Sequence, residues 1–140
     1  MANEELRRFA ARMETVAYAA LRIVAGALFA FHGLQKLTGW MMQGHHVAVG
    51  SQAWFGGIIE LVAGGLIAIG LVARCAAFVA SGEMAVAYFQ FHWKLKFAHW
   101  MWLPAANHGE LAVLYCFIFL FIACRGSGPV SVDAVIWRRR

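Results

Sequence analysis

The sequence contains few charged residues and few residues that interrupt helices. Of its 140 residues, 14% are charged and two are prolines, whereas 62% are hydrophobic. A soluble domain of this size would expose too much apolar surface at that composition. The length allows only one domain. The composition therefore argues against an ordinary soluble domain and favours an all-α integral membrane protein.

The three cysteines and the outer histidines also lack the spacing of familiar redox or metal sites. Cys75, Cys116 and Cys124 form no C-x-x-C pair and no zinc-binding pattern, so we interpret them as small packing residues rather than redox groups. His45 and His46 are adjacent and point apart on any regular element, so we expect no metal site there. The chain also has no nucleotide-binding motif and no pair of haem-ligating histidines placed across the bilayer.

Four long apolar stretches dominate the chain, at residues 16–37, 53–73, 75–91 and 103 or 109–124. A bilayer core about 30 Å thick requires about 20 helical residues. The first two stretches meet that length; the third does so if it extends to Trp93, and the fourth if it begins near Pro104. We predict an antiparallel, up-and-down bundle of four transmembrane helices. A soluble bundle of unusually apolar helices is the alternative.

The charges divide between the two sides of this four-span arrangement. Most arginines fall on the side of the two termini, and the lysines fall on the other side. This bias predicts that both termini are cytoplasmic, and it offers no reason to expect nucleic acid as a partner. We divide the chain into three parts. Residues 1–15 form a cytoplasmic segment, which is either an interfacial helix or a frayed end. Residues 16–125 form the four-helix membrane domain, and residues 126–140 form a cytoplasmic tail.

Every predicted span carries an ionisable residue. An ionised side chain at the bilayer centre costs about 2.5–3.5 kcal/mol on insertion scales, so such residues are expected to face the bundle interior. At 100° per residue, one face of the first helix carries Arg22, Gly26, Phe29, His32, Gly33 and Lys36. Similar stripes contain Gly56, Glu60 and Gly64 on the second helix, Glu83, Ala87, Gln90 and Lys94 on the third, and Glu110, Leu114, Phe117, Phe121 and Cys124 on the fourth.

The depth of each residue sorts these charges into two groups. His32, Lys36, Glu60 and Glu110 should meet in the outer half of the membrane, and we predict a functional site there because four ionisable groups exceed what helix register requires. Arg22 and Glu83 are predicted to pair deeper in the bundle. For that pair, a purely structural role in fixing helix register is equally open.

The fourth helix has two candidate starting points. Asn107 precedes Glu110 by three residues, which matches an N-cap followed by an acidic residue. Pro104 is the alternative start, since proline is favoured in the first helical turn. A break between the two would leave a short turn over the predicted site.

These residues together resemble the DoxX family of small four-span bacterial membrane proteins. The resemblance is carried by Arg22, by HGLQKL at residues 32–37, by GGIIEL at 56–61 and GGL at 64–66, by EMA at 83–85, by NHGE at 107–110 and by G-x-G-P-x-S-x-D at 126–133. It implies a membrane subunit of an oxidoreductase system, similar to the small subunits of thiosulfate:quinone oxidoreductase or linked to thiol and oxidative-stress systems.

From the helix faces and this resemblance we predict a quinone-type pocket that receives electrons from sulfur or thiol donors through a partner subunit. The predicted catalytic residues are His32, Lys36, Glu60 and Glu110, and the predicted cofactor-binding residues are Arg22, Gly56, Gly57, Gly64, Glu83 and Asn107. The alternative is a noncatalytic accessory or assembly subunit, or a small permease, in which Phe89, Phe91, Phe117, Phe119 and Phe121 face lipid or a partner. A homo-oligomer is also compatible with the sequence.

Overall fold

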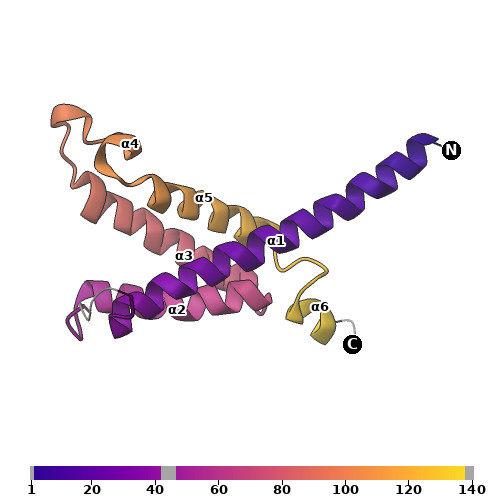
Figure 1. The fold of residues 1–140 in the computed structure, drawn as a ribbon, viewed down its shortest axis with the longest axis horizontal. Helices are drawn as coiled ribbons and strands as arrows, with labels where there is room; N and C mark the ends of the chain where they lie inside the picture. The colour runs from indigo at the N-terminus through magenta and orange to yellow at the C-terminus, as the bar shows by residue number, and fades with distance from the viewer. Residues whose placement is uncertain (1, 42–46, 138–140) are drawn as a thin grey trace.

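A computed structural model describes residues 2–41 and 47–137 of the chain, and these residues contain helices but no strands. Figure 1 shows how the helices are arranged. Their bounds are α1 Ala2–Thr38, α2 Gln52–Ile69, α3 Ala73–Ala87, the π-helix η1 Tyr88–Trp93, the 3₁₀ turn η2 Ala98–Trp100, α4 Pro104–Asn107, α5 Glu110–Arg125 and α6 Val132–Trp137. The expected all-α class is confirmed.

The long helices associate as two antiparallel pairs, α1 with α2 and α3 with α5. In the first pair, a Cβ placed on Gly33 would lie 2.4 Å from the Leu61 amide nitrogen, so the two backbones nearly touch. In the second pair, the Ser81 hydroxyl donates a hydrogen bond of 2.8 Å to the Cys116 carbonyl. Both chain ends lie at the same end of the molecule (Figure 1). The packing between α2 and α3, and between α1 and α5, is less extensive than the packing within each pair.

Helix α1 is longer than a membrane span requires. Its 37 residues extend about 55 Å at a rise of 1.5 Å per residue. Residues 2–15 continue the same helix without a break. They project beyond the other helices (Figure 1), and Leu6 and Phe9 are 67% and 60% exposed.

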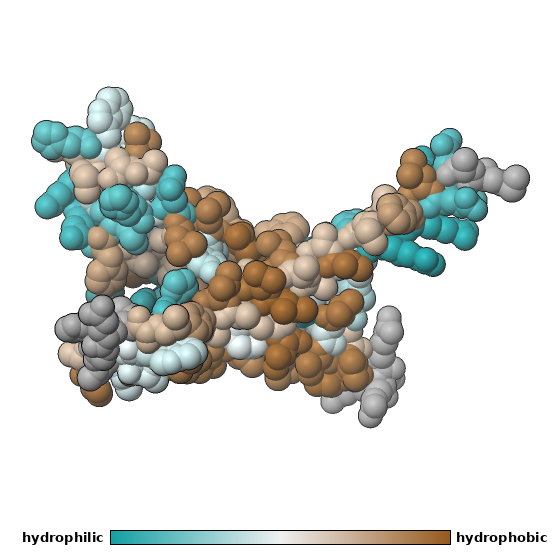
Figure 2. Space-filling model, viewed as in Figure 1, coloured by the Kyte–Doolittle hydropathy of each residue, from teal (hydrophilic) through white to brown (hydrophobic). Residues whose placement is uncertain are grey.

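Two helices, α1 and α2, are long and apolar enough to cross a membrane, among the residues described. Helix α3 has 15 residues before it continues into η1, and α5 has 16. Figure 2 shows a broad hydrophobic surface over the middle of the molecule, with hydrophilic residues gathered near α4 and at the start of α1. This distribution is that of a membrane-embedded helical protein.

The core is built mainly from aromatic and alanine side chains. Phe29 of α1 lies 4.7 Å from Phe119, measured between ring centroids, and Tyr115 stacks on Phe119 at 5.3 Å. Phe119 is fully buried, so its assignment to a lipid-facing surface was wrong; Phe89, Phe91, Phe117 and Phe121 are 47–64% exposed. The inward face of α5 carries Ala112, Tyr115, Phe119 and Ile122.

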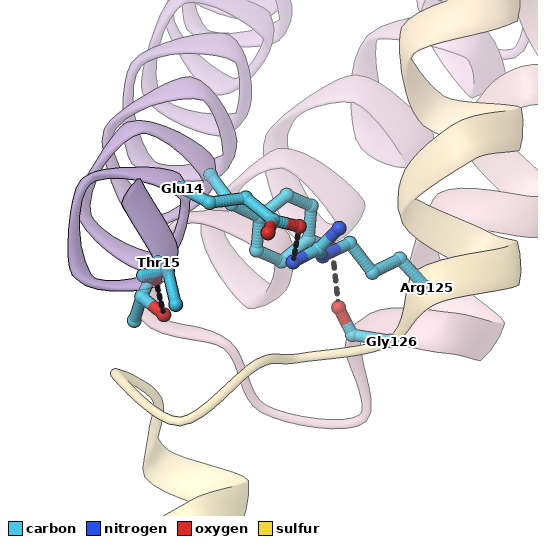
Figure 3. A network of polar contacts seen from close by, with 6 residues as sticks. Glu14, Thr15, Arg125 and Gly126 are labelled. Carbon is cyan, nitrogen blue, oxygen red and sulfur yellow. Dashed lines mark hydrogen bonds and ion pairs between the residues drawn. The ribbon is translucent and has the colours of Figure 1, made fainter. Parts of the chain in front are cut away.

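The segment that follows α5 folds back onto the middle of α1 and onto the adjoining ends of α2 and α3. Tyr18 donates a hydrogen bond to the Gly126 carbonyl, and the guanidinium of Arg125 lies over the Tyr18 ring at 4.6 Å. Arg125 also pairs with Glu14 at 2.7 Å (Figure 3). Asp133 accepts a hydrogen bond of 3.1 Å from the Val72 amide. Asp133 therefore ties the C-terminal segment to the start of α3.

Asp133 makes this tethering dependent on pH. Burial alone would raise its pKa, but hydrogen bonds from the Ser127 hydroxyl and from the Val72 and Ala73 amides, with the charge of Arg22, lower the pKa below its usual 3.8. A depressed pKa contributes stability that is present above the unfolded value and is lost as the pH falls through the folded value. The tail is thus held firmly at neutral pH.

We expect α6 to detach in acid. A spin label on α6 should show a restrained electron paramagnetic resonance spectrum at pH 7 and become mobile only as the pH falls below 3.8. Asp133→Asn should be mobile already at pH 7, because an uncharged amide weakens the hydrogen bonds from Ser127 and from the Val72 and Ala73 amides and has no charge to attract Arg22. A restrained spectrum for Asp133→Asn, or one that loosens near pH 6, would contradict this assignment.

Candidate functional site

The centre of the site is an ion pair between α1 and α2. Lys36 Nζ lies 2.6 Å from Glu60 Oε1, and the side chains are 35% and 4% exposed. Lys36 is two residues before the end of α1, whereas Glu60 lies in the middle of α2. Glu60 Oε2 is buried and has no hydrogen-bond partner among the described residues. The pair therefore leaves one buried acceptor available.

A second carboxylate, Glu83 of α3, lies near this pair, although it makes no ion pair within 4 Å among the described residues. The charges that act on Glu83 are those of Glu60 and Lys36. Its Oε2 is also buried without a hydrogen-bond partner in the described chain, and its Oε1 would lie 3.0 Å from a Cβ on Gly56. Gly56 thus makes room for the carboxylate. The site contains one lysine and two carboxylates from three helices.

The predicted pairing of Arg22 with Glu83 is wrong. Arg22 is 1% exposed and donates a hydrogen bond of 2.7 Å to the Val130 carbonyl in the C-terminal segment. It packs against Gly70, where an added Cβ would lie 1.5 Å from Nη1. Glu83 packs against Gly56. Gly56 lies 14 residues before Gly70 in the sequence, which corresponds to about 21 Å along α2. Arg22 therefore holds the C-terminal segment and lies far from the site.

A cavity of about 470 Å³ opens between α2 and α3 beside the ion pair. Its polar lining consists of Lys36, Gln52, Glu83 and His92, and the rest is apolar or glycine, including Phe55 and Phe91. Pockets for small organic molecules measure about 300–1,000 Å³ and combine apolar walls with a few polar groups. The cavity has the size and lining of a ligand site.

A smaller cavity of about 220 Å³ lies on the other side of the pair. Glu60 lines it together with His32, His92, His108 and Tyr115. The ring of His32 meets the edge of Tyr115 at 6.4 Å between centroids. Lys36 and His92 line both cavities, so they form part of the wall between them. His108 is exposed and connects this cavity with the outside.

His92 belongs to the site, although the α-helical pattern did not select it. We predicted that Gln90 and Lys94 would continue the inward face of Glu83 and Ala87, and both are exposed. The helix changes to π geometry at Tyr88, which rotates the following residues relative to an α-helix. His92 then turns inward, and its Nδ1 lies 3.2 Å from the Asn107 carbonyl.

Glu110 does not join the site. It is exposed in the first turn of α5 and lines neither cavity. Its stripe is the outward face of the helix, as Leu114, Phe117 and Phe121 are 59%, 64% and 48% exposed. A carboxylate in a first turn is stabilised by the helix dipole, so Glu110 needs no buried partner.

The remaining predicted site residues have structural roles. Gly57 and Gly64 face α1, where a Cβ on Gly57 would lie 3.2 Å from the Lys36 Cβ and one on Gly64 would lie 2.4 Å from the Ala30 amide nitrogen. Asn107 ends α4; its side chain donates to the Met101 carbonyl at 2.8 Å and accepts from the Gly109 amide at 2.8 Å. Helix α5 is capped by Gly109, and the alternative start at Pro104 begins the separate helix α4.

No group of three or more histidine, cysteine or acidic side chains is arranged to hold a metal ion within the described ranges. His45 and His46 lie outside the described residues. Cys75 and Cys124 are exposed and Cys116 is partly buried, and all three are free thiols.

Comparison with known proteins gives two matches. The DoxX family model matches residues 17–93, which include both members of the ion pair and Glu83. An uncharacterised protein of Haemophilus influenzae is 39% identical over 122 residues, covering 85% of this chain and 90% of that protein. No solved structure matches the chain.

Proposed function

The chain belongs to the DoxX family of membrane proteins, and from its site we propose that it is a quinone-binding subunit of a membrane oxidoreductase. The observation that carries the proposal is the buried, unpartnered Oε2 atom of Glu60 and of Glu83 around a single lysine. Buried polar atoms without partners are rare and costly, so a ligand with hydrogen-bonding groups is the natural complement.

A quinone headgroup fits the chemistry of the larger cavity. A quinone accepts two electrons and two protons; its carbonyl oxygens accept hydrogen bonds, and the hydroxyls of the reduced form donate them. Lys36 offers a charged donor, and Glu83 offers an acceptor, within a cavity of about 470 Å³. Glu60 already pairs with Lys36 and compensates its charge, so a neutral ring is preferred to a phosphate or a carboxylate.

The smaller cavity supports movement of protons to this site. Glu60 lies behind Lys36, and His32, His92 and His108 line the space between Glu60 and the outside. A histidine ring carries one donor and one acceptor nitrogen, so it can relay a proton. In this arrangement Lys36 orients the ring, Glu83 and His92 contact it, and Glu60 exchanges protons through the histidines. His32 acts on the proton path rather than directly on the ring.

We further propose that the chain crosses the bacterial inner membrane four times, with α1, α2, α3 continued by η1, and α5 as the spans and both termini in the cytoplasm. Supporting this orientation, Arg74 and Arg125 lie at the end of the molecule that carries both termini. We propose that a partner subunit then supplies electrons from a sulfur or thiol donor.

Titration of the purified full-length protein with a tail-less benzoquinone tests the proposal. Saturable binding is expected for the wild type. Glu83→Gln should weaken it about tenfold, because the amide replaces one carboxyl oxygen with an NH₂ group and an ordinary hydrogen bond contributes about 0.5–1.5 kcal/mol. Glu110→Gln is the matched control, with the same chemical change on an exposed carboxylate, and should bind like the wild type. Absence of saturable binding to the wild type, or equal losses in both variants, would refute the proposal.

A further inference from the structure

We propose that the seam between α2 and α3 is the binding groove for the isoprenoid tail of the quinone, which makes the substrate a long-tailed membrane quinone that enters sideways from the bilayer. This inference rests on the proposed function. The groove measures about 340 Å³ and is lined entirely by apolar side chains and one cysteine, among them Val62, Leu66 and Ala76.

The groove continues directly from the larger cavity. Ile59 of α2 and Val79 of α3 line both spaces, so the polar cavity and the apolar groove share a boundary. The cavity occupies the half of the seam near Gln52, and the groove occupies the half near Val72. Between Gly56 and Leu66 the seam runs about 15 Å along α2. A headgroup held by Lys36 and Glu83 would therefore have its tail directed along this seam.

The exposure of the groove fits a tail that stays in contact with lipid. Val62 is 55% exposed and Val79 is 50% exposed, so the groove is open on the side that faces the hydrocarbon. A phospholipid chain could contact the same side chains. However, Lys36 in the adjoining cavity is already paired with Glu60 at 2.6 Å and Glu83 lines the same cavity, which disfavours the phosphate group that a phospholipid would bring with it.

A second apolar groove lies between α1 and α5, but it connects with a cavity too small for a headgroup. This groove measures about 520 Å³ and shares Leu111 and Tyr115 with the smaller cavity. That cavity, about 220 Å³, is below the usual range for organic ligands, about 300–1,000 Å³. The sizes of the two cavities therefore select the α2–α3 groove for the tail.

Two matched tryptophan substitutions test this assignment. Val62→Trp fills the α2–α3 groove, and Val24→Trp fills the α1–α5 groove; the two valines are 55% and 54% exposed, so neither change should disturb the core. Binding to the purified full-length protein is measured for a tail-less benzoquinone and for the same headgroup with a long isoprenoid tail. Retained binding of the tail-less compound shows that each variant is folded and keeps the headgroup site.

We expect Val62→Trp to weaken binding of the long-tailed quinone about tenfold, equivalent to about 1.4 kcal/mol, while binding of the tail-less compound is unchanged. Val24→Trp should leave both unchanged. The assignment is overturned if Val24→Trp gives the selective loss, or if neither variant does while the headgroup still binds. Failure of the wild type to bind either compound would instead remove the proposed function itself.

Discussion

Gly64→Val is expected to separate α1 from α2 and to leave the protein unfolded or aggregated in mild detergent. A Cβ at this position would lie 2.4 Å from the Ala30 amide nitrogen and 2.6 Å from the Gly26 carbonyl oxygen. Both are backbone atoms of a helix and cannot rotate away, unlike the end of a side chain. Overpacking of cores costs about 1–3 kcal/mol when side chains can adjust, and the loss here should reach or exceed the upper value.

The neighbouring glycine provides a matched control. An added Cβ at Gly65 meets no atom within 4 Å in the described structure, although Gly65 occupies the same helix one residue later. Gly65→Val introduces the same side chain with the same effect on helix propensity, so the comparison isolates the contact between helices. Thermal unfolding and size-exclusion profiles of the two variants measure the difference. Similar behaviour of both variants would mean that α1 and α2 do not pack through Gly64.

Lys36→Met is expected to destabilise the protein by about 3 kcal/mol, on the order of 10 °C in melting temperature, and the double variant Lys36→Met/Glu60→Gln should recover most of that loss. Removal of the lysine leaves the Glu60 carboxylate buried, at 4% exposure, without its only ion-pair partner in the described chain. Removing one partner of a buried ion pair lowers the stability more than replacing both partners, because the remaining charge is uncompensated.

The stability of the single variant Glu60→Gln should lie between that of Lys36→Met and that of the double variant. It leaves Lys36, whose side chain is 35% exposed and can reach solvent through the cavities. Thermal unfolding of all four proteins completes a double-mutant cycle, which yields the coupling energy of the pair. If the double variant is as unstable as the sum of the two single variants, Lys36 and Glu60 do not interact across the helices.

The stability cycle and the quinone titration answer different questions. The cycle reports whether the ion pair holds α1 against α2, and the titration of Glu83→Gln reports whether the site binds a ring. Glu83 is suited to the second measurement because it makes no ion pair within 4 Å in the described residues, whereas Glu60 is paired with Lys36 at 2.6 Å. The coupling energy between Lys36 and Glu60 can therefore be present when quinone binding is absent, and quinone binding can be present when the coupling energy is absent.

The sequence by itself determined the all-helical class, the family and the inward faces of α1 and α2. In the sequence, glycines and charged residues recur on one face of each of these two helices. In the structure, Glu60 and Gly64 of that face of α2 are buried. An isolated charge in an apolar run costs too much to face hydrocarbon, which is why Lys36 and Glu60 could be matched from the pattern alone.

The tertiary structure decided which charges meet. A buried charge in α3 marks only that Glu83 faces inward; whether it meets Arg22 or the Lys36–Glu60 pair depends on the depth at which α3 packs. The π-helix at Tyr88 rotates His92 into the site, and α-helical periodicity has no signal for that change. Glu110 was assigned inward because it is charged, but at the first turn of α5 a carboxylate is stabilised by the helix end itself. Periodicity specifies a face within one helix, whereas a site requires the relative depth and rotation of several helices, and only their packing supplies these.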